Sequence, residues 1–562
     1  MTIIGIDLGT TNSLVSVYRN GKVELIPNQF GELLTPSVVS IANGNTIVVG
    51  KTAKERLITN PEETFASYKQ YMGSEETFTY GKYRFKAEDL SSFVLKQLKE
   101  DAEKYLGEEI EEAIISVPAY FNDLQRVATR NAGILAGLKV ERILNEPSAA
   151  ALAYREKEGE DGLFIVFDFG GGTLDISLVE VFENIVDIIA VSGDNHLGGD
   201  NIDEALLNEF LKENSLDSKI INKKDLAILK RKIEEAKIAL SHQDVVMVEA
   251  SINNSNYSIE FDHKKVAICC AEILGKIRTT LERVLRDGNK HVSDIDKIIC
   301  VGGSTKSRVV QDYIEHLTDI IPEDHINPDE AIAHGVGVAA GIKERNEEIK
   351  DMILTDICPF SLGTGLYDGS FSPIIPRNTS LPASRSHHYT TIRDKQTMIN
   401  FTIYQGENMK AARNLKLDAI EVEVPPLPKG EALVLVSFTY DLNGLLDVEL
   451  ESMDTGKKTS KLIVMNHQLK QDEIDTRMKV LNQLKKESSE NVRKDYLLAR
   501  AESLYEELPP YEKEAVLERL RAFEEAYNGL NLVEREKAIR EFEDFLKSYR
   551  AYDTGLKQDF YS

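Results

Sequence analysis

The chain has 562 residues, of which 42% are hydrophobic and 28% are charged, and its net charge is −26 at pH 7. This length is too great for a single hydrophobic core and predicts three or four domains. A negative charge of this size repels nucleic-acid phosphates, so we expect no nucleic-acid partner. No segment approaches about 18 consecutive apolar residues, and the N-terminus has no basic region followed by an apolar run. We therefore expect no membrane association and a cytoplasmic location.

Cysteine usage points to a reducing compartment. The four cysteines show no C-x-x-C spacing, which argues against a structural zinc site. We expect buried, reduced thiols at Cys269, Cys270, Cys300 and Cys358.

Residues 1–350 alternate between two patterns. Short apolar runs that end in polar residues or glycine, such as "TIIGIDLGTT" and "LFIVFDFGGGT", are typical of buried strands. Between them lie segments with apolar residues three or four apart, such as "DLSSFVLKQLKEDAEKYLG", which predict amphipathic helices. This alternation predicts an α/β domain over residues 1–350.

The composition changes after residue 350. Seven of the sixteen prolines fall between Pro359 and Pro428, and segments such as "MINFTIYQG" and "LVLVSFTYD" alternate apolar and polar residues. We expect a compact antiparallel β domain at residues 359–466.

Residues 467–562 are charged and helical in pattern. Apolar stripes at helical spacing predict a small helical bundle, with a coiled-coil partner surface as the alternative. The stripes consist of Val516, Leu520, Phe523 and Tyr527, and of Ile539, Phe542 and Leu546.

Residues 351–358, "DMILTDIC", form the expected linker between the α/β and β domains. Met352, Ile353 and Leu354 are apolar, whereas a passive linker is polar. Two interpretations stay open: the linker docks on a neighbouring surface, or it is the first strand of the β domain.

Two similar motifs carry the chemistry. "GIDLGTTNS" places Asp7 at the end of a strand before Gly9, Thr10 and Thr11, and "FDFGGGTLD" repeats the pattern from Asp168. Two such hairpins can face each other across a cleft. Their N–H groups and hydroxyls would then contact phosphate oxygens, while the two aspartates hold a hydrated Mg²⁺. One such motif alone is weak, because similar turns are common.

A third glycine-containing segment, "VGGSTKS" at residues 301–307, follows the strand "KIIC". Its open backbone could receive a flat nucleoside, although Ser304 and Thr305 alone could equally be a helix cap. Neither a G-x-x-x-x-G-K-[ST] loop nor a G-x-G-x-x-G motif is present.

The three glycine segments, in this order, resemble the actin-like ATPase superfamily. "ISVPAYFNDLQRVATRNAGILAGL", "ILNEPSAAALAY", "GDNHLGGDNID" and "NPDEAIAHG" narrow the resemblance to the DnaK family, the 70 kDa heat-shock class. "ILTDICPFSLG" and "FSPIIPRNTSLP" extend the resemblance through the linker to about residue 465. The linker sequence is most similar to that of the HscC branch. The resemblance implies an actin-like two-lobed ATPase domain, an antiparallel β-sandwich and a short α-helical lid.

The resemblance also implies ligands and residue roles. ATP or ADP, Mg²⁺ and K⁺ are the expected ligands. The catalytic residues would be Lys69, Glu146, Asp168, Thr173, Asp175 and Asp194, with Asp7 and Asp168 at the metal. The nucleotide would contact Asp7, Gly9, Thr10, Thr11, Asn12, Gly170, Gly171, Gly172, Thr173, Gly198, Gly199, Glu234, Lys237, Ser241, Gly302, Gly303, Ser304, Lys306 and Asp329.

The sequence departs from its family beside the expected adenine. Many relatives have arginine where this chain has Ile238 and Lys306. A lysine cannot stack on a ring as a planar guanidinium does. Our hypothesis is that adenine is held less firmly and that ADP leaves relatively fast.

In the β domain, alternate residues of "YTTIRDKQTMINF" resemble the lining of a peptide groove. Tyr367 and Ile392 would arch over the peptide, and Ile399 and Phe401 would line its central pocket. The alternative is that these are core residues of the sandwich. Backbone contacts with one apolar pocket would select extended apolar segments of unfolded proteins.

Communication between ATP and peptide would run through the linker. ATP would favour a docked linker and weak peptide binding, and ADP a free linker and tight binding. A J-domain co-chaperone is an expected partner, and the need for an exchange factor is left open. The matching allosteric positions are Pro118, Arg126, Arg142, Ile353, Leu354 and Asp356.

Two other classes of function fit the sequence less well. A sugar or acetate kinase would need no separate β domain behind an apolar linker. An actin-like filament protein would have no use for residues 359–562. The sequence therefore favours an ATP-driven, peptide-binding chaperone.

Overall fold

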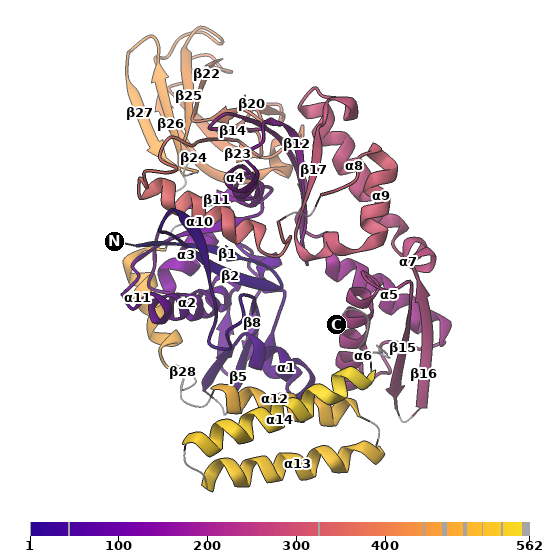
Figure 1. Ribbon diagram of the computed structural model, residues 1–562. Helices are drawn as coiled ribbons and strands as arrows, with labels where there is room; N and C mark the ends of the chain where they lie inside the picture. The colour runs from indigo at the N-terminus through magenta and orange to yellow at the C-terminus, as the bar shows by residue number, and fades with distance from the viewer. Residues whose placement is uncertain are drawn as a thin grey trace.

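The computed structural model describes residues 2–42, 45–253, 255–323, 326–441, 444–463, 469–486, 492–508, 510–529 and 532–553. Within them the α/β part consists of two lobes around two six-stranded sheets (Figure 1). In lobe I, β1 pairs with β2 and with β10, and β10 with β11, whereas β4 pairs only with β2. The strands of this sheet are β1 (Ile3–Leu8), β2 (Asn12–Arg19), β3 (Lys22–Ile26), β4 (Thr35–Pro36), β10 (Glu112–Val117) and β11 (Lys139–Asn145).

Lobe II repeats this plan. An antiparallel meander of three strands begins with a buried strand, β12, which pairs in parallel with β17 on its other side, as β1 does with β10. The repetition explains why two similar strand–glycine motifs occur in the sequence. The strands of this sheet are β12 (Gly162–Phe169), β13 (Leu174–Phe182), β14 (Ile185–Asp194), β17 (Lys297–Val301), β18 (Ile353–Ile357) and β21 (Ser380–Leu381).

Smaller sheets and most helices complete the lobes. Lobe I also has a sheet of β5 (Val39–Ala42), β6 (Thr46–Val49), β7 (Thr64–Phe65) and β28 (Lys485–Lys486), the hairpin β8 (Phe78–Tyr80) and β9 (Tyr83–Phe85), and helices α1 (Lys51–Thr59), α2 (Ala87–Leu106) and α3 (Asp123–Leu135). Lobe II has the hairpin β15 (Val245–Ile252) and β16 (Ser255–Asp262), and helices α5 (Gly199–Glu213), α6 (Lys223–Ala239), α7 (His263–Cys269), α8 (Ala271–Asp287) and α9 (Arg308–Thr318).

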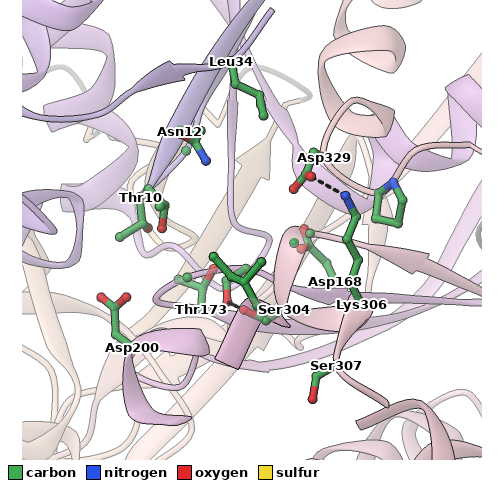
Figure 2. A pocket seen from close by; sticks show the side chains of 18 of the residues that line it. Thr10, Asn12, Leu34, Asp168, Thr173, Asp200, Ser304, Lys306, Ser307 and Asp329 are labelled. Atoms are coloured by element: carbon green, nitrogen blue, oxygen red, sulfur yellow. Dashed lines mark hydrogen bonds and ion pairs between the residues drawn. The ribbon is translucent and has the colours of Figure 1, made fainter. Parts of the chain in front are cut away.

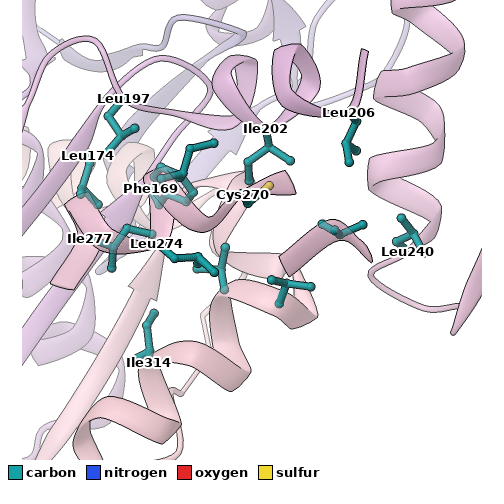
Figure 3. Packing of buried hydrophobic residues seen from close by; sticks show 14 of the residues in the cluster. Phe169, Leu174, Leu197, Ile202, Leu206, Leu240, Cys270, Leu274, Ile277 and Ile314 are labelled. Atoms are coloured by element: carbon teal, nitrogen blue, oxygen red, sulfur yellow. The ribbon is translucent and has the colours of Figure 1, made fainter. Parts of the chain in front are cut away.

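Each lobe has its own hydrophobic core, and a third core joins them. In lobe II, Phe169 and Leu174, at the ends of β12 and β13, pack towards Ile202 of α5 and Ile277 of α8 (Figure 3). The turn between these two strands is therefore supported from below by apolar packing. The third core lies around α4 (Glu146–Glu158) and α10 (Ala331–Lys343), which pack against each other between the two sheets.

The crossing of α4 and α10 requires a glycine. A Cβ atom built on Gly335 would lie 1.7 Å from the carbonyl oxygen of Ala149, which is far inside van der Waals contact. The "NPDEAIAHG" segment thus ends on a residue that lets the two helices approach closely.

The β domain consists of two four-stranded sheets that share one core, as the alternating sequence pattern predicts. Phe401 and Ile403 of one sheet and Val436 and Phe438 of the other are buried in it. The first sheet has β19 (Leu362–Gly365), β20 (Phe371–Ile375), β23 (Met398–Gln405) and β24 (Leu415–Glu423); the second has β22 (Ala383–Thr390), β25 (Leu433–Tyr440), β26 (Leu446–Ser452) and β27 (Lys458–Leu462).

The linker is docked. Its strand β18 pairs in parallel with β14 of lobe II, with Ile353 opposite Ile185 and Leu354 opposite Val186. It also pairs with β21, at Asp356 and Ile357. The docked interpretation fits this pairing, whereas β18 belongs to neither of the two β-domain sheets.

The helical part differs from the expected division at residue 467, which itself lies outside the described residues. Leu481 is buried in the core of lobe I, and Arg477 of α11 forms an ion pair of 3.0 Å with Glu88 of α2, so α11 belongs to lobe I. The predicted stripes do pack together: the rings of Phe523 and Phe542 stack with centroids 4.5 Å apart. The helices are α11 (Gln471–Leu481), α12 (Val492–Glu507), α13 (Pro510–Gly529) and α14 (Leu532–Asp553).

The four cysteines form no disulfide, as expected, but Cys269 is only half-buried, unlike Cys270, Cys300 and Cys358. In the part of the chain that the structure describes, each helix is too short or too polar to cross a membrane.

The α4–α10 contact predicts the effect of one methyl group. Gly335→Ala should lower the free energy of unfolding by about 1–3 kcal/mol, because the helices must separate to admit the Cβ. Urea unfolding followed by circular dichroism measures this difference. The matched control is Gly275→Ala in α8, where nothing lies within 4 Å of the added atom. There alanine should stabilise by about 0.5–1 kcal/mol, and equal effects at both positions would contradict the packing argument.

Candidate functional site

The two strand–glycine turns meet, as the motifs predict. One turn joins β1 to β2 at Gly9–Thr11, and the other joins β12 to β13 at Gly170–Thr173. A Cβ atom on Gly171 would lie 2.0 Å from Oγ1 of Thr11. Any larger residue at 171 would displace the Thr11 hydroxyl, because the second turn comes within contact distance of the first.

A cavity of about 340 Å³ opens between the lobes at these turns, within the usual size of a ligand site. Side chains from both lobes point into it in Figure 2. Most of the predicted site residues line it: Asp7, Gly9, Thr10, Thr11, Asn12, Lys69, Glu146, Asp168, Gly170, Gly171, Thr173, Glu234, Lys237, Ser241, Gly302, Gly303, Ser304, Lys306 and Asp329.

Five predicted residues are absent from this lining: Gly172, Asp175, Asp194, Gly198 and Gly199. Asp175 is buried as the cross-strand partner of Asp168. Asp194 accepts a hydrogen bond of 2.9 Å from the backbone of His196, which makes it a turn residue here. The backbone N–H of Gly199 donates to the carbonyl of Gly170, at 2.9 Å, and so supports the second turn.

The floor of the cavity is acidic. Burial, followed by the charge of Glu146, raises the pKa of Asp7 to about 7 and that of Asp175 to about 8. The same two causes raise the pKa of Asp168 well above its usual value. Among the described residues, Oδ2 of Asp168 has no hydrogen-bond partner. Buried, unsatisfied carboxylates of this kind fit a hydrated divalent cation.

One buried cation faces these acids. Nζ of Lys69 lies 2.9 Å from Oε1 of Glu146, and both side chains are at most 6% exposed. The ion pair holds an ammonium group at the wall of the cavity, where it can meet an anionic ligand.

The third glycine segment departs from the simple strand–helix start that the sequence predicts. A 3-10 turn at Gly303–Lys306 precedes α9. Thr305 donates to the carbonyl of Gly302, at 2.7 Å, whereas Ser304 donates across to the carbonyl of Gly170, at 2.9 Å. The cap interpretation is wrong for both residues, because the N-cap residue of α9 is Ser307. Thr305 closes the 3-10 turn, and Ser304 joins the second and third glycine segments.

The outer part of the cavity is lined by one face of α6. Glu234 and Lys237 line it, as their spacing predicts, together with Ile238, which is 56% exposed. Ser241 lines it too, but it lies in the turn just after α6 ends. Nζ of Lys306 lies 2.6 Å from Oδ2 of Asp329, the contact drawn dashed in Figure 2.

Sequence reasoning missed several lining residues. Asp200 and Asp203 follow "HLGG" directly, on the first turns of α5, so their position beside that motif could have revealed them. Leu34 and Lys54 lie in lobe I segments without a motif. They reach the cavity only through the approach of the two lobes.

A chain of hydrogen bonds leads from this site to the linker. Nδ2 of Asn145, the neighbour of Glu146, donates to both carboxylate oxygens of Asp356, at 2.8 and 2.9 Å. Ser148 donates to the same carboxylate, at 3.1 Å. Arg126 donates to Oδ1 of Asn145, at 2.6 Å. Asn145 and Ser148 were not predicted, because "NEPS" gave a role only to its glutamate.

The other predicted allosteric residues lie close by. The carbonyl of Pro118 accepts from the backbone of Phe121, whose own carbonyl accepts from Nε of Arg126. Burial lowers the pKa of Arg142, and the nearby charge of Asp356 opposes that shift. Of the two apolar linker residues, Leu354 packs against the core between the lobes, whereas Ile353 is 54% exposed.

The β domain contacts lobe I beside this chain. Tyr440 donates to Oδ1 of Asp123 at 3.0 Å, and the backbone N–H of Asp123 donates to Oε1 of Gln405 at 3.0 Å. The side chain of Val127 is buried in the β-domain core. Helix α3 is therefore shared between lobe I and the β domain.

The predicted peptide residues divide into two groups. Tyr367 is 81% exposed in the turn after β19, and Ile392 is exposed after β22. Phe401, in contrast, is buried in the core against the ring of Tyr389, with ring centroids 5.4 Å apart, and Ile399 packs against that core. The core interpretation thus fits Phe401 in this conformation.

Comparison with known proteins agrees with this architecture. The family model described as "Hsp70 protein" matches residues 3–80 and 74–544. The chain is similar to "Chaperone protein DnaK" of Thermotoga petrophila, with 39% identity over 84% of this chain and 82% of the relative. It is also similar to the protein of that name from Thermosipho africanus, with 38% identity over 88% of this chain and 84% of the relative.

Proposed function

We propose a working cycle for this protein from the premise that the chain belongs to the Hsp70 family. The protein is an ATP-dependent chaperone and an ATPase. The family binds ATP or ADP with Mg²⁺ and takes unfolded peptides as substrates. In the proposed cycle, nucleotide and peptide bind at separate places, and β18 carries the signal between them.

The nucleotide would bind in the cavity between the lobes of an actin-like ATPase domain. Backbone N–H groups of the two turns and the hydroxyls of Thr10, Thr11 and Thr173 would hold its phosphates. Asp7 and Asp168 would hold Mg²⁺, which supplies positive charge to the phosphate oxygens when bound. K⁺ stays a prediction from the family resemblance.

Hydrolysis would depend on the buried ion pair. Lys69 would orient the attacking water and neutralise the charge that develops on the γ-phosphate. Glu146 would fix the ammonium group and help position that water. Asp175 and Asp194 stay predictions; the burial of Asp175 behind Asp168 supports an indirect role for it.

One observation carries the proposed coupling: Asn145 and Glu146 are adjacent in the sequence, and their side chains contact different parts of the molecule. Glu146 holds Lys69 in the cavity, while Asn145 holds Asp356 of the docked linker. A shift of Glu146 on hydrolysis would move Asn145 and weaken the hold on β18. The β domain would then separate from lobe I and close on peptide.

Peptide would bind in the β domain, below an arch of Tyr367 and Ile392. The exposure of both side chains supports that role. Ile399 and Phe401 would line the pocket only if the ring of Tyr389 moves away, because that ring packs against Phe401. A J-domain partner at Arg142 and Asp356, a lid role for the last helices, membership of the HscC branch and a cytoplasmic location stay predictions.

Removal of the linker carboxylate tests the coupling. Asp356→Ala should make the peptide affinity in ATP approach that in ADP, because the docked state loses three hydrogen bonds to a charged group. We expect the ratio of the two peptide Kd values to fall about tenfold, within the usual range of allosteric coupling. Fluorescence anisotropy with a labelled, extended apolar peptide measures both values. The exposed Asp351→Ala is the matched control, and an unchanged ratio in Asp356→Ala would rule out the proposed route.

The adenine hypothesis has its own test. The ion pair between Lys306 and Asp329 supports it, because the ammonium group is held at a carboxylate. In the double variant Ile238→Arg/Lys306→Arg, ADP release should slow about three- to tenfold as guanidinium groups stack on the ring. Stopped-flow displacement of labelled ADP gives the rate. Equal rates in variant and wild type would remove the hypothesis.

A further inference from the structure

Helix α12 lies across the outer ends of both lobes. Figure 1 shows it beside α1, at the end of the molecule opposite the β domain. It packs along α1 of lobe I, where the ring of Tyr496 meets that of Phe30 at 5.4 Å and Nζ of Lys51 at 4.5 Å. It also reaches α6 of lobe II, where Glu506 forms an ion pair with Lys224. One helix of the C-terminal part thus contacts both walls of the nucleotide cleft.

Four charged side chains form a closed network at the point where the three helices meet. Arg231 of α6 lies 2.9 Å from Glu55 of α1 and 3.3 Å from Glu507 of α12. Arg500 of α12 lies 3.5 Å from the same Glu55 and 3.3 Å from the same Glu507. Each acid therefore serves both arginines. Nη1 of Arg231 also donates to Oγ of Ser503, at 3.0 Å.

The network is largely removed from water. The four side chains are between 9% and 17% exposed, so their attraction is screened far less than that of a surface pair. Burial raises the pKa of Glu55, but Arg231 and Arg500 together outweigh it and the pKa is lowered. The carboxylate is thus held ionised between two arginines. A network of this kind is costly to break one partner at a time, because each break leaves a buried charge.

This network adjoins the nucleotide cavity. Lys54, the neighbour of Glu55, and Glu234, one turn along α6 from Arg231, both line the cavity. These two residues form an ion pair between the lobes, with Nζ of Lys54 3.1 Å from Oε1 of Glu234. Residues that hold α1 and α6 together therefore set the width of the cavity mouth.

We propose that Arg231 is a positioning residue of the nucleotide site, through which docked α12 clamps the two lobes together and slows nucleotide release. Release requires α1 and α6 to separate, and that movement must break the contacts of Arg231. With α12 in place, Arg231 has as partners the carboxylates of Glu55, Glu507 and Glu235 and the hydroxyl of Ser503. With α12 removed, Glu235 stays a partner within α6, and Glu55 is left as the partner on α1. Such a lobe-to-lobe pair, open to water, stabilises little. Docking of α12 would thus retain nucleotide, and its departure would free it.

Release of a fluorescent N-methylanthraniloyl ATP from the full-length chain, chased with excess ATP over seconds, tests the clamp. Glu507→Gln removes a charge that belongs to α12 alone and leaves the contact between Glu55 and Arg231 in place. We expect release about five- to tenfold faster, with an unchanged association rate, because broken buried pairs act mainly on dissociation. Arg231→Met should give a similar acceleration. The double variant should be no more than about twofold faster than the faster single variant, because both break one unit.

Control variants separate the clamp from general damage. Glu514→Gln changes an exposed acid on α13 and should leave release unchanged. Ser503→Ala removes one hydrogen bond of Arg231 with little risk to folding and should accelerate release about two- to threefold. If Glu507→Gln and Ser503→Ala release nucleotide at the wild-type rate while Arg231→Met is faster, the α1–α6 contact acts alone and the role of α12 is overturned. If the two single effects multiply in the double variant, the network is not one unit and the proposal is likewise overturned.

Discussion

The buried ion pair between Lys69 and Glu146 is the interaction on which the rest of the site depends. Around it, Asp7 and Asp168 in the cavity and Asp175 behind it are buried with raised pKa values, so these acids outnumber the buried ammonium of Lys69. This excess explains why the cavity suits a divalent cation with a phosphate ligand. Because Glu146 begins α4 beside Asn145, a change of charge in the cavity would also act on the linker in the proposed cycle.

The docked linker lies in one sheet between β14 of lobe II and β21. β18 extends the lobe II sheet at β14 and also pairs with β21, a short strand that lies between β20 and β22 in the sequence. Beside it, Asp123 of α3 contacts Gln405 and Tyr440 of the β domain. Release of β18 would therefore remove both a sheet edge and the neighbouring contacts at once. At the opposite end of the cleft, helix α12 makes a second, independent contact between the C-terminal part of the chain and both lobes.

Local patterns in the sequence predicted much of this. The turns after β1 and β12 could be predicted, because a loop that would hold phosphate needs a buried strand, an acid and a glycine close together in the sequence. The face of α6 was visible because residues three and four apart share a helix face. The apolar linker excluded a passive, solvated linker, which is polar, but it left docking and a first strand of the β domain equally open. The contacts of Asn145, Lys54 and Arg231 could not be predicted, because their partners lie far away in the sequence. The attachment of α11 to lobe I was missed for the same reason: its short apolar face fits any core equally well.

The central claim is that nucleotide controls whether β18 is paired with β14. Amide hydrogen exchange at residues 353–357 measures this pairing directly, because a strand in a sheet exchanges slowly and a free linker exchanges fast. With ATP bound, the account predicts protection of these amides, including that of Ile353, which donates to the carbonyl of Asn184 at 2.8 Å. With ADP bound, the same amides should lose that protection. Equal exchange of the linker in the two nucleotide states would contradict the account.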